Sequence, residues 1–374
     1  MRTIHVPECC FGISSITRKP VLVDVFLILD DTGLPLWHEN LFLIDQAKEF
    51  GINTCRAYAN DLLSFARMHM PMGGWMAVSE SVFNGYVAGD LIQARKFSEA
   101  SVVRHTITVK KFYEWLYLKG YLNAEIGFNW NFKKHFVEKR DDLDAADTTA
   151  HSHHSTYITP ASFKLLCKQV TSSNSFISTR DRVCLKLGYL CGTRATETLR
   201  INAHRLLKAA TKCKDENSGI WATTTYMIIG KGNKRRNLEI PPSLCRDISN
   251  FVQRFPQVFS NPRCTLICRE DGGRLHNYKH ASYAYTKAQQ AAALPRIGHQ
   301  GYHALRKSFG TNLVNQCHKL GVDPWVVVPR RMGHENVETT YGYIFFEALL
   351  NGRSHLLTEL RMMTHKGLGH ARAT

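Results

Sequence analysis

The sequence has no apolar segment long enough to cross a membrane. Its longest apolar runs are Val21–Leu29, which Asp24 interrupts, and Trp325–Val328, whereas a membrane-spanning helix needs about 20 apolar residues. The first residues also lack the apolar stretch that is typical of a secretory signal peptide. We therefore expect a protein that does not associate with membranes and that resides in the cytoplasm.

The eleven cysteines lack the pattern of a disulfide framework or a metal site. Their number is odd and their spacing irregular, which is typical of reduced thiols in a cytosol. Cys264 and Cys268 lie four residues apart, and three histidines cluster at positions 151, 153 and 154, but neither group has a second pair at the spacing of zinc ligands. We expect buried thiols, a His-rich linker and no metal.

Acidic residues are too few to balance the basic ones. There are 48 Lys and Arg against 31 Asp and Glu, so the formal net charge is +17. Such an excess favours a polyanionic partner, either nucleic acid or an anionic membrane surface, and the missing apolar segments weaken the second option. Hydrophobic residues make up 44% of the chain, which excludes wholesale disorder.

A polar stretch divides the chain. Residues 139–156 contain few large apolar residues and show no helical or strand period, which predicts a linker. The 374 residues suggest two domains at roughly 150 residues each. We expect a helical domain at 39–138, preceded by an N-terminal segment at 1–38, and a second domain at 157–374.

The N-terminal segment contains a candidate β-hairpin. Val21–Leu29 is apolar and β-branched, the next residues form a turn, and Leu34–Trp37 is the expected return strand. In the domain that follows, one helix is expected near Thr54 and another from about Ser101 to Lys119.

The second domain is expected to be mostly helical, with two strands around a basic turn. Its predicted helices cover 160–170, 180–191, 195–207, 243–254, 277–293, 303–317 and 323–332, its strands are Trp221–Ile229 and Asn237–Ile240, and a final helix is Ile344–Met362. The predicted fold class is mainly α with a small antiparallel sheet.

Two basic segments of the second domain suit phosphate groups. Gly192 ends one predicted helix and Arg194 begins the next, so backbone N–H groups and a guanidinium converge at a helix N-terminus. The turn Lys231–Arg236 carries four cations in six residues. Such a turn between two strands is able to contact the DNA backbone.

A third segment combines histidine, arginine and tyrosine. His303 and Arg306 lie three residues apart and share one face of a predicted helix. His334 follows a glycine, and Tyr341 and Tyr343 come shortly after it.

Together these segments resemble the tyrosine recombinase (phage integrase) family. In that family the catalytic domain carries an Arg after a Thr-Gly-like pair, a Lys on a β-hairpin, a His-x-x-Arg, a Gly-His, and a Tyr nine residues beyond that His. The residues that match in order and spacing are Arg194, Lys231, His303, Arg306, His334 and Tyr343. The resemblance covers about residues 155–350, and the helical region at about 40–135 looks like the family's core-binding domain.

The resemblance implies a site-specific recombinase or integrase that cleaves and rejoins duplex DNA through a 3′-phosphotyrosine intermediate. Arg194 and Arg306 would bind the non-bridging oxygens of the phosphate, because their forks are permanently charged and bidentate. They would do the work of a metal, so we expect no metal and no cofactor.

The same resemblance assigns the remaining roles. Tyr343 would be the nucleophile, and His303 is the better candidate for the general base because the pKa of histidine lies near neutrality. Lys231 would protonate the departing 5′ oxygen, with Lys234 as the alternative if the hairpin register differs. His334 would donate a hydrogen bond to the phosphate.

The sequence departs from the family pattern at three places within these motif segments. Cys191 and Thr193 replace the usual Thr and Leu around the glycine. Pro329 interrupts the predicted helix before His334, where a kink would shift that histidine. Tyr341 competes with Tyr343 for the role of nucleophile, although the spacing from His334 favours Tyr343.

The sequence also leads to expectations about DNA contacts and about binding partners. Contacts to the DNA backbone are expected from Lys234, Arg235, Arg236, Lys307, Arg330 and Arg331. The resemblance implies duplex DNA with specific recombination sites, a homotetramer on that DNA, accessory DNA-bending or partner recombinase proteins, and a nucleoid-associated location in a prokaryotic cell. The final helix would dock either on a neighbouring protomer or on its own core.

Two other functions are compatible with the same motifs. A type IB topoisomerase uses the same chemistry on one strand, and a non-catalytic DNA-binding or architectural protein would retain the fold alone. The short distance from His334 to Tyr343 favours a recombinase over the first, and the intact set of six residues argues against the second.

Overall fold

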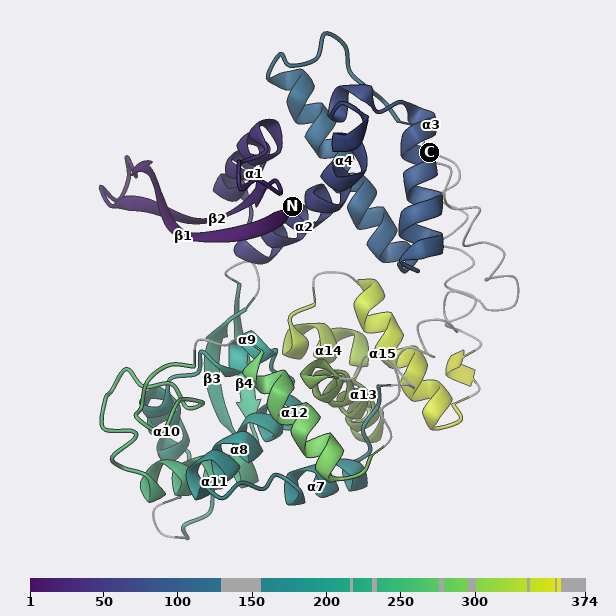
Figure 1. Cartoon of the computed structure of the whole chain (residues 1–374). Coiled ribbons are helices and arrows are strands. Elements are labelled where there is room, and N and C mark those ends of the chain that lie inside the picture. Colours follow the sequence, from purple (N-terminus) through teal and green to yellow (C-terminus); the bar gives the residue numbers. More distant parts are fainter. Residues whose placement is uncertain are drawn as a thin grey trace. The chain divides into compact units, whose positions relative to one another are not determined.

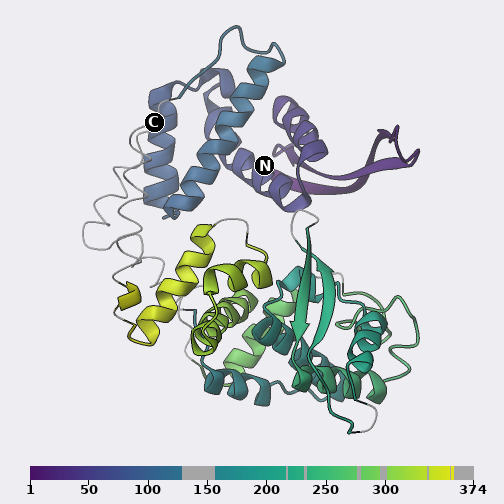
Figure 2. The same ribbon diagram turned by 180° about the vertical axis from the view of Figure 1, so that it is seen from behind.

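The computed structural model describes residues 1–128, 156–215, 218–230, 234–275, 279–294, 301–334, 337–353 and 355–357, with backbone only at 337 and 338. It divides into two compact units, Met1–Asp142 and Leu143–Thr374, which Figures 1 and 2 show from opposite sides. The described residues are mostly helical, with two small antiparallel sheets. This architecture confirms the predicted fold class. The predicted linker at 139–156 lies outside the described residues except at its last position.

The N-terminal unit begins with a β-hairpin whose first strand was not predicted. β1 (Arg2–Ile13) pairs antiparallel with β2 (Pro20–Leu29). The predicted return strand at Leu34–Trp37 is wrong, because these residues form a single bridge, Leu29 with Pro35, before a helix begins at Trp37. A four-residue segment that contains a proline offers few ladder donors, whereas β1 offers a long partner.

The helices of this unit follow the hairpin. They are α1 (Trp37–Glu49), α2 (Ile52–His69), α3 (Glu80–Gly85) and α4 (Glu99–Leu118), with 3₁₀ turns η1 (Met70–Met72) and η2 (Trp75–Ala77) and a π-helical segment η3 (Tyr86–Ala94). The predicted helices near Thr54 and from Ser101 are therefore present as α2 and α4. Leu62, Phe65 and Phe112 are fully buried, and the same apolar cluster includes Phe26 and Ile28 of β2, so the hairpin and helices share one core.

The C-terminal unit contains a longer series of elements. They are α7 (Pro160–Lys168), α8 (Ser175–Cys191), α9 (Ala195–Thr198), α10 (Ala203–Lys212), β3 (Thr224–Ile229), β4 (Arg235–Ile240), α11 (Pro242–Arg254), α12 (His280–Ala291), α13 (Tyr302–Leu320), α14 (Pro324–Met332) and α15 (Val337–Leu350). β3 and β4 pair antiparallel, from Thr224 opposite Ile240 to Ile229 opposite Arg235. The two strands around the basic turn are thus confirmed.

Two predicted helices differ from the observed ones. The helix at 195–207 is two helices, because the Asn202 side chain accepts a hydrogen bond from the Arg205 N–H at 2.8 Å and caps a new helix, α10. The final helix begins at Val337 rather than at Ile344 and ends at Leu350, close to Gly352 in the left-handed conformation (φ 62°). Residues 358–362 of the predicted helix lie outside the described residues.

Helix α13 joins α8 and α12 to the last two described helices of the unit. It packs against α8, α12, α14 and α15. At Gly188 of α8, an added Cβ would lie 2.8 Å from Cζ of Tyr302, so the absent side chain lets α13 approach α8 closely. The Tyr302 hydroxyl is hydrogen bonded to Thr198 at 2.8 Å and donates to the Cys184 carbonyl at 2.9 Å. The start of α13 is thereby held against α8 and α9.

Two broader expectations are also addressed by the described residues. All eleven cysteines are free thiols, and most are buried. Within the described ranges, no helix has the length and apolarity that a membrane span requires.

Candidate active site

A glycine turn at the end of α8 lies between two arginines. Gly192 adopts the left-handed conformation (φ 64°), and an added Cβ would overlap the Phe309 ring, so both backbone and space require glycine here. Its carbonyl accepts hydrogen bonds from Nη1 of Arg306 and, at 3.3 Å, from Nη2 of Arg236. The turn therefore links α13 and β4 to the end of α8.

Arg194 directly follows this turn and is paired with a buried carboxylate. Its Nη1 donates to Oε1 of Glu197 at 2.8 Å, and its backbone N–H donates to Oε2 of the same residue at 2.8 Å. The Arg194 side chain is 31% exposed, so part of its guanidinium stays available to a ligand. Two hydrogen bonds to the buried Glu197 thus hold Arg194 in place.

Glu197 is a site residue that was not singled out in the sequence. It is 3% exposed and accepts a further hydrogen bond from Nη2 of Arg236 at 2.7 Å. Burial alone would raise the pKa of Glu197, but the bonds from Arg236 and Arg194 lower it below its usual value. The available signal was an acidic residue three positions after a helix N-cap, which is the spacing of a capping box.

Arg306 connects the ends of two helices. It is 2% exposed, and besides the bond to Gly192 its Nη2 donates to the carbonyl of Met332 at 2.5 Å. Burial, and then the positive charges of Arg194 and Arg236, lower the pKa of Arg306 to about 10. The guanidinium therefore remains charged at neutral pH and adds to the positive potential of the site.

His303 lies on α13 close to Arg306. Partial burial among its neighbours, followed by the charges of Arg306, Lys307 and Arg194, lowers the pKa of His303 to about 4, although the residue as a whole stays exposed to solvent. The imidazole is accordingly neutral at pH 7 and has a nitrogen that can accept a proton, although the lowered pKa makes it a weaker base than the near-neutral value expected from the sequence.

His334 follows α14, and Pro329 does not interrupt that helix as expected. α14 continues through Pro329 to Met332, since a proline in this short helix removes only one backbone donor, the one to the residue four positions earlier. The Pro329 carbonyl accepts hydrogen bonds from the backbone N–H groups of Gly333 at 2.7 Å and of His334 at 3.1 Å. The proline therefore helps to fix the turn that carries His334.

The His334 ring lies against the ring of Tyr343. The two rings are stacked, with centroids 5.4 Å apart and planes 13° from parallel. Nδ1 of His334 is 3.0 Å from Oγ1 of the buried Thr340. Burial, and then the charges of Arg306, Arg194 and Arg236, lower the pKa of His334 to about 4, so this ring is also neutral at pH 7.

Tyr343 is buried on α15, and a glycine makes room for it. The residue is 4% exposed, and a Cβ added at Gly310 of α13 would lie 2.6 Å from Cε1 of the tyrosine. Burial raises the pKa of Tyr343 to about 12, against the lowering effect of Arg306 and Arg194. Gly310 was not singled out in the sequence, although a glycine inside a helix is the type of signal that marks close packing.

Tyr341 has a different environment. Its ring is stacked on Phe345 at 5.8 Å and lies 6.4 Å from the Trp325 ring. It is only partly buried, in an apolar cluster. Of the two tyrosines, Tyr343 is the one whose ring stacks on His334.

Lys231 lies outside the described residues, but both ends of its hairpin are described. The Gly230 N–H donates to the Lys234 carbonyl at 2.7 Å. A Cβ added at Gly230 would lie 3.1 Å from Oε1 of Glu197. The base of the hairpin is therefore adjacent to the pair of Glu197 and Arg194.

The six cations expected to contact DNA have different surroundings. Lys234, Arg235 and Arg330 are exposed, and Lys307 is partly buried. Nη1 of Arg331 is 2.5 Å from Oε2 of Glu239. Contacts from these five to a DNA backbone stay predictions.

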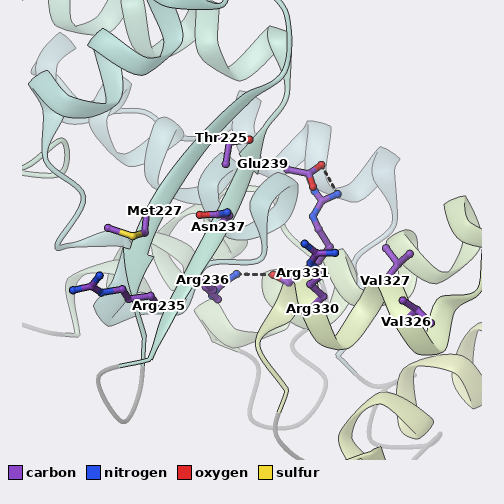
Figure 3. Close-up of a pocket in the computed structure, with 10 residues that line it drawn as sticks. All are labelled: Thr225, Met227, Arg235, Arg236, Asn237, Glu239, Val326, Val327, Arg330 and Arg331. Carbon is purple, nitrogen blue, oxygen red and sulfur yellow. Dashed lines mark hydrogen bonds and ion pairs between the residues drawn. The ribbon is translucent and has the colours of Figure 1, made fainter.

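Arg236 differs most from that expectation. Its side chain is only 7% exposed, because neighbouring residues of a strand point to opposite faces and its face is turned toward Glu197. Figure 3 shows Arg236 directed to the backbone of Arg331, while Arg235 points away from it. The inward position is the opposite of what a surface phosphate contact requires.

A groove of about 600 Å³ lies between the β3–β4 hairpin and α14. Its lining residues are Thr225, Met227, Arg235, Arg236, Asn237, Glu239, Val326, Val327, Arg330 and Arg331 (Figure 3). Within the described ranges, His, Cys, Asp and Glu side chains form no group of three that could hold a metal ion.

The two site histidines predict a pH-dependent stability. Both pKa values fall from 6.5 to about 4 in the folded protein, so between these values the unfolded chain binds more protons. The contribution of the two histidines to the free energy of unfolding is therefore complete above pH 6.5. It is lost as the pH falls toward 4, so the protein becomes less stable. We expect urea unfolding of the full chain to show a smaller loss between about pH 7 and about pH 5 in His334→Asn than in the wild type. Equal losses in both proteins would contradict the assigned shift.

Two family models match the chain. The model described as "Phage integrase family" matches residues 157–345, and the model described as "Phage integrase, N-terminal SAM-like domain" matches residues 41–120. The first match alone spans about half of the chain. Together the two models cover most of α1, all of α2 and α4, and the whole of the site.

Curated relatives carry the name tyrosine recombinase XerC. The protein from Thermodesulfovibrio yellowstonii is 22% identical over 302 residues, which cover 78% of this chain and 85% of the relative. The protein from Listeria welshimeri is 23% identical over 304 residues, which cover 79% of this chain and 88% of the relative.

Solved structures show the same fold. The XerH site-specific recombinase bound to palindromic difH substrate has a TM-score of 0.58 at 18% identity, covering 84% of this chain and 82% of that chain. A lambda integrase dimer bound to a COC′ core site has a TM-score of 0.52 at 12% identity, covering 82% and 76%. The chain therefore belongs to the phage integrase family and is a tyrosine recombinase, a site-specific recombinase that breaks and rejoins DNA.

Proposed function

We propose that Tyr343 attacks the scissile phosphate of one DNA strand and forms a 3′-phosphotyrosine bond. The bond from phosphorus to the 5′ oxygen breaks, and the 5′ hydroxyl of the next nucleotide leaves. The reverse attack by a 5′ hydroxyl rejoins the strand, because the covalent link preserves the energy of the broken bond. The observation that carries this proposal is the position of Tyr343, stacked on His334 and in the positive field of Arg306 and Arg194.

The remaining site residues would stabilise the transition state and move protons. Arg194, which is 31% exposed, and Arg306 would bind the non-bridging oxygens, where negative charge develops. The neutral His303 would accept the Tyr343 proton, because a tyrosine whose pKa is about 12 is rarely ionised at pH 7. His334 would donate a hydrogen bond to the phosphate, and Lys231 would protonate the 5′ oxygen.

The substrate would be duplex DNA with specific recombination sites. The net charge of +17 supports a DNA partner, and the solved relatives include XerH bound to its difH substrate and a lambda integrase tetramer bound to a Holliday junction. On this basis the protein would act as a homotetramer on DNA, with accessory DNA-bending or partner recombinase proteins. It would act in the cytoplasm of a prokaryotic cell, at the nucleoid.

The test uses a pool of nicked duplexes with randomised sequence, in which loss of the short strand beyond the nick traps the covalent intermediate. We expect an adduct that resists denaturation, whose DNA converges on one sequence and whose modified peptide contains Tyr343. Two duplexes of the selected sequence should then exchange strands, which a topoisomerase would not achieve. A wild-type protein that binds the pool but yields no such adduct would instead support the architectural alternative.

The contact of Gly310 with Tyr343 predicts a selective loss of activity. In Gly310→Ala the new methyl group would lie 2.6 Å from Cε1 and 2.7 Å from Cδ1 of the tyrosine, so the ring must move. We expect cleavage of the nicked duplex to fall about tenfold or more, and overpacking to cost about 1–3 kcal/mol. A matched control is Gly85→Ala in α3, where an added Cβ has no neighbour within 4 Å. Wild-type cleavage by Gly310→Ala would disprove the tight fit.

A further inference from the structure

Arg236 makes a set of inward contacts that a surface cation would not make. Its Nη2 donates to Oε2 of Glu197 at 2.7 Å and to the Gly192 carbonyl at 3.3 Å, and its Nη1 donates to the Arg331 carbonyl at 2.7 Å. A Cβ added at Gly333 would lie 3.0 Å from Cδ of Arg236. The guanidinium thus fills a cradle formed by the segments after α8 and at the end of α14.

Each group that Arg236 contacts also binds, or lies next to, a residue of the proposed chemistry. Glu197 holds Arg194 by two hydrogen bonds. The Gly192 carbonyl is shared with Arg306, which also binds the carbonyl of Met332, the residue after Arg331. The turn at Gly333 leads directly to His334. Arg236 therefore contacts the supports of both site arginines and of this histidine.

We propose that Arg236 is a positioning residue that locks strand β4 to the segments carrying Arg194 and His334. This inference rests on the proposed function of the site. Arg236 touches no reacting atom in this role, and it acts by holding Glu197 and the backbone at Arg331. Its hydrogen bonds to Glu197, Gly192 and Arg331 explain why this cation of the basic hairpin points inward.

The geometry requires arginine rather than any cation. Three acceptors from two different segments surround one planar group, and only a fork with two terminal nitrogens reaches them together. A lysine would place one ammonium group near Glu197 but would lose the hydrogen bond to the Gly192 carbonyl or the one to the Arg331 carbonyl. We therefore expect that Lys does not rescue Arg at position 236.

The experiment compares Arg236→Lys and Arg236→Gln with Arg235→Gln, the exposed neighbour on the same strand. On the selected nicked duplex, affinity and its salt dependence are measured separately from the cleavage rate of the bound complex. We expect both Arg236 variants to cleave at least tenfold more slowly when fully bound, while their affinities stay within about twofold of wild type. Arg235→Gln should instead weaken binding and reduce the salt slope by about one phosphate contact.

Two further measurements separate positioning from a general loss of structure. In a double-mutant cycle, the effect of Arg236→Gln on the bound cleavage rate should shrink in a Glu197→Gln background, because the two side chains act through one bond. Removing the charge in Arg236→Gln should also raise the pKa of the His334 imidazole, measured by NMR titration, because the Arg236 charge helps to lower it. Arg236→Lys should leave that pKa in place.

The outcomes are distinguishable. If the wild type forms no adduct, the proposed function fails before Arg236 is tested. If the wild type cleaves, and Arg236→Lys either cleaves at the wild-type rate when bound or loses only affinity and salt dependence, the positioning role is overturned. Additive effects in the double-mutant cycle would overturn it as well.

Discussion

Replacing Tyr343 by phenylalanine should abolish the covalent protein–DNA adduct. The substitution removes a single oxygen, and the buried ring keeps its packing against Gly310 and His334. No bond to phosphorus is then possible at this position, so the loss should be complete rather than partial. The measurement is the fraction of nicked duplex that migrates with the protein after denaturation.

Tyr341→Phe is the matched control for this experiment. The two tyrosines are two residues apart on α15, but Tyr341 packs against Trp325 and Phe345. We expect Tyr341→Phe to retain the adduct. DNA binding by both variants should stay close to wild type, because neither loses a charge. An adduct that persists in Tyr343→Phe and disappears in Tyr341→Phe would reassign the nucleophile.

Arg306→Ala should lower the cleavage rate by about 10³ or more. Loss of one preorganised donor to a developing oxyanion typically costs about 10²–10³, and this substitution removes a charged group as well. It also removes the donor to the Met332 carbonyl and leaves the Gly192 carbonyl with only the longer bond from Arg236, at about 1–3 kcal/mol for a buried group that stays unsatisfied. The turns that carry Arg194 and His334 would lose a common support.

Two further variants distinguish the effect of the Arg306 charge from that of its two-nitrogen guanidinium geometry. Arg306→Lys keeps a cation but reaches only one of the two carbonyls, so we expect it to remain well below wild type in cleavage. Arg246→Ala, an exposed arginine on α11, is the control for a change in net charge. Bound-state cleavage rates and thermal unfolding midpoints are measured for all three. An Arg306→Lys protein as active as the wild type would show that charge alone is required.

The sequence by itself determined the family, and six of its residues match that family's motif in order and spacing. The motif combines fixed cations, a proton acceptor and a nucleophile, and these residue types are recognisable without a structure. The helical periods also predicted most elements of the C-terminal unit, because such signals depend on neighbouring residues. Local patterns thus located Tyr343 and its partners along the chain.

Only the tertiary structure decided how these residues are supported. The partner of β2 is β1 rather than the nearer segment, because strand pairing depends on which segment offers a complete ladder. Glu197, Gly310 and the inward turn of Arg236 follow from contacts between α9, α13, α15 and β4. Such contacts join residues that are far apart in the chain. Local sequence patterns depend only on neighbouring residues, so they do not predict these contacts.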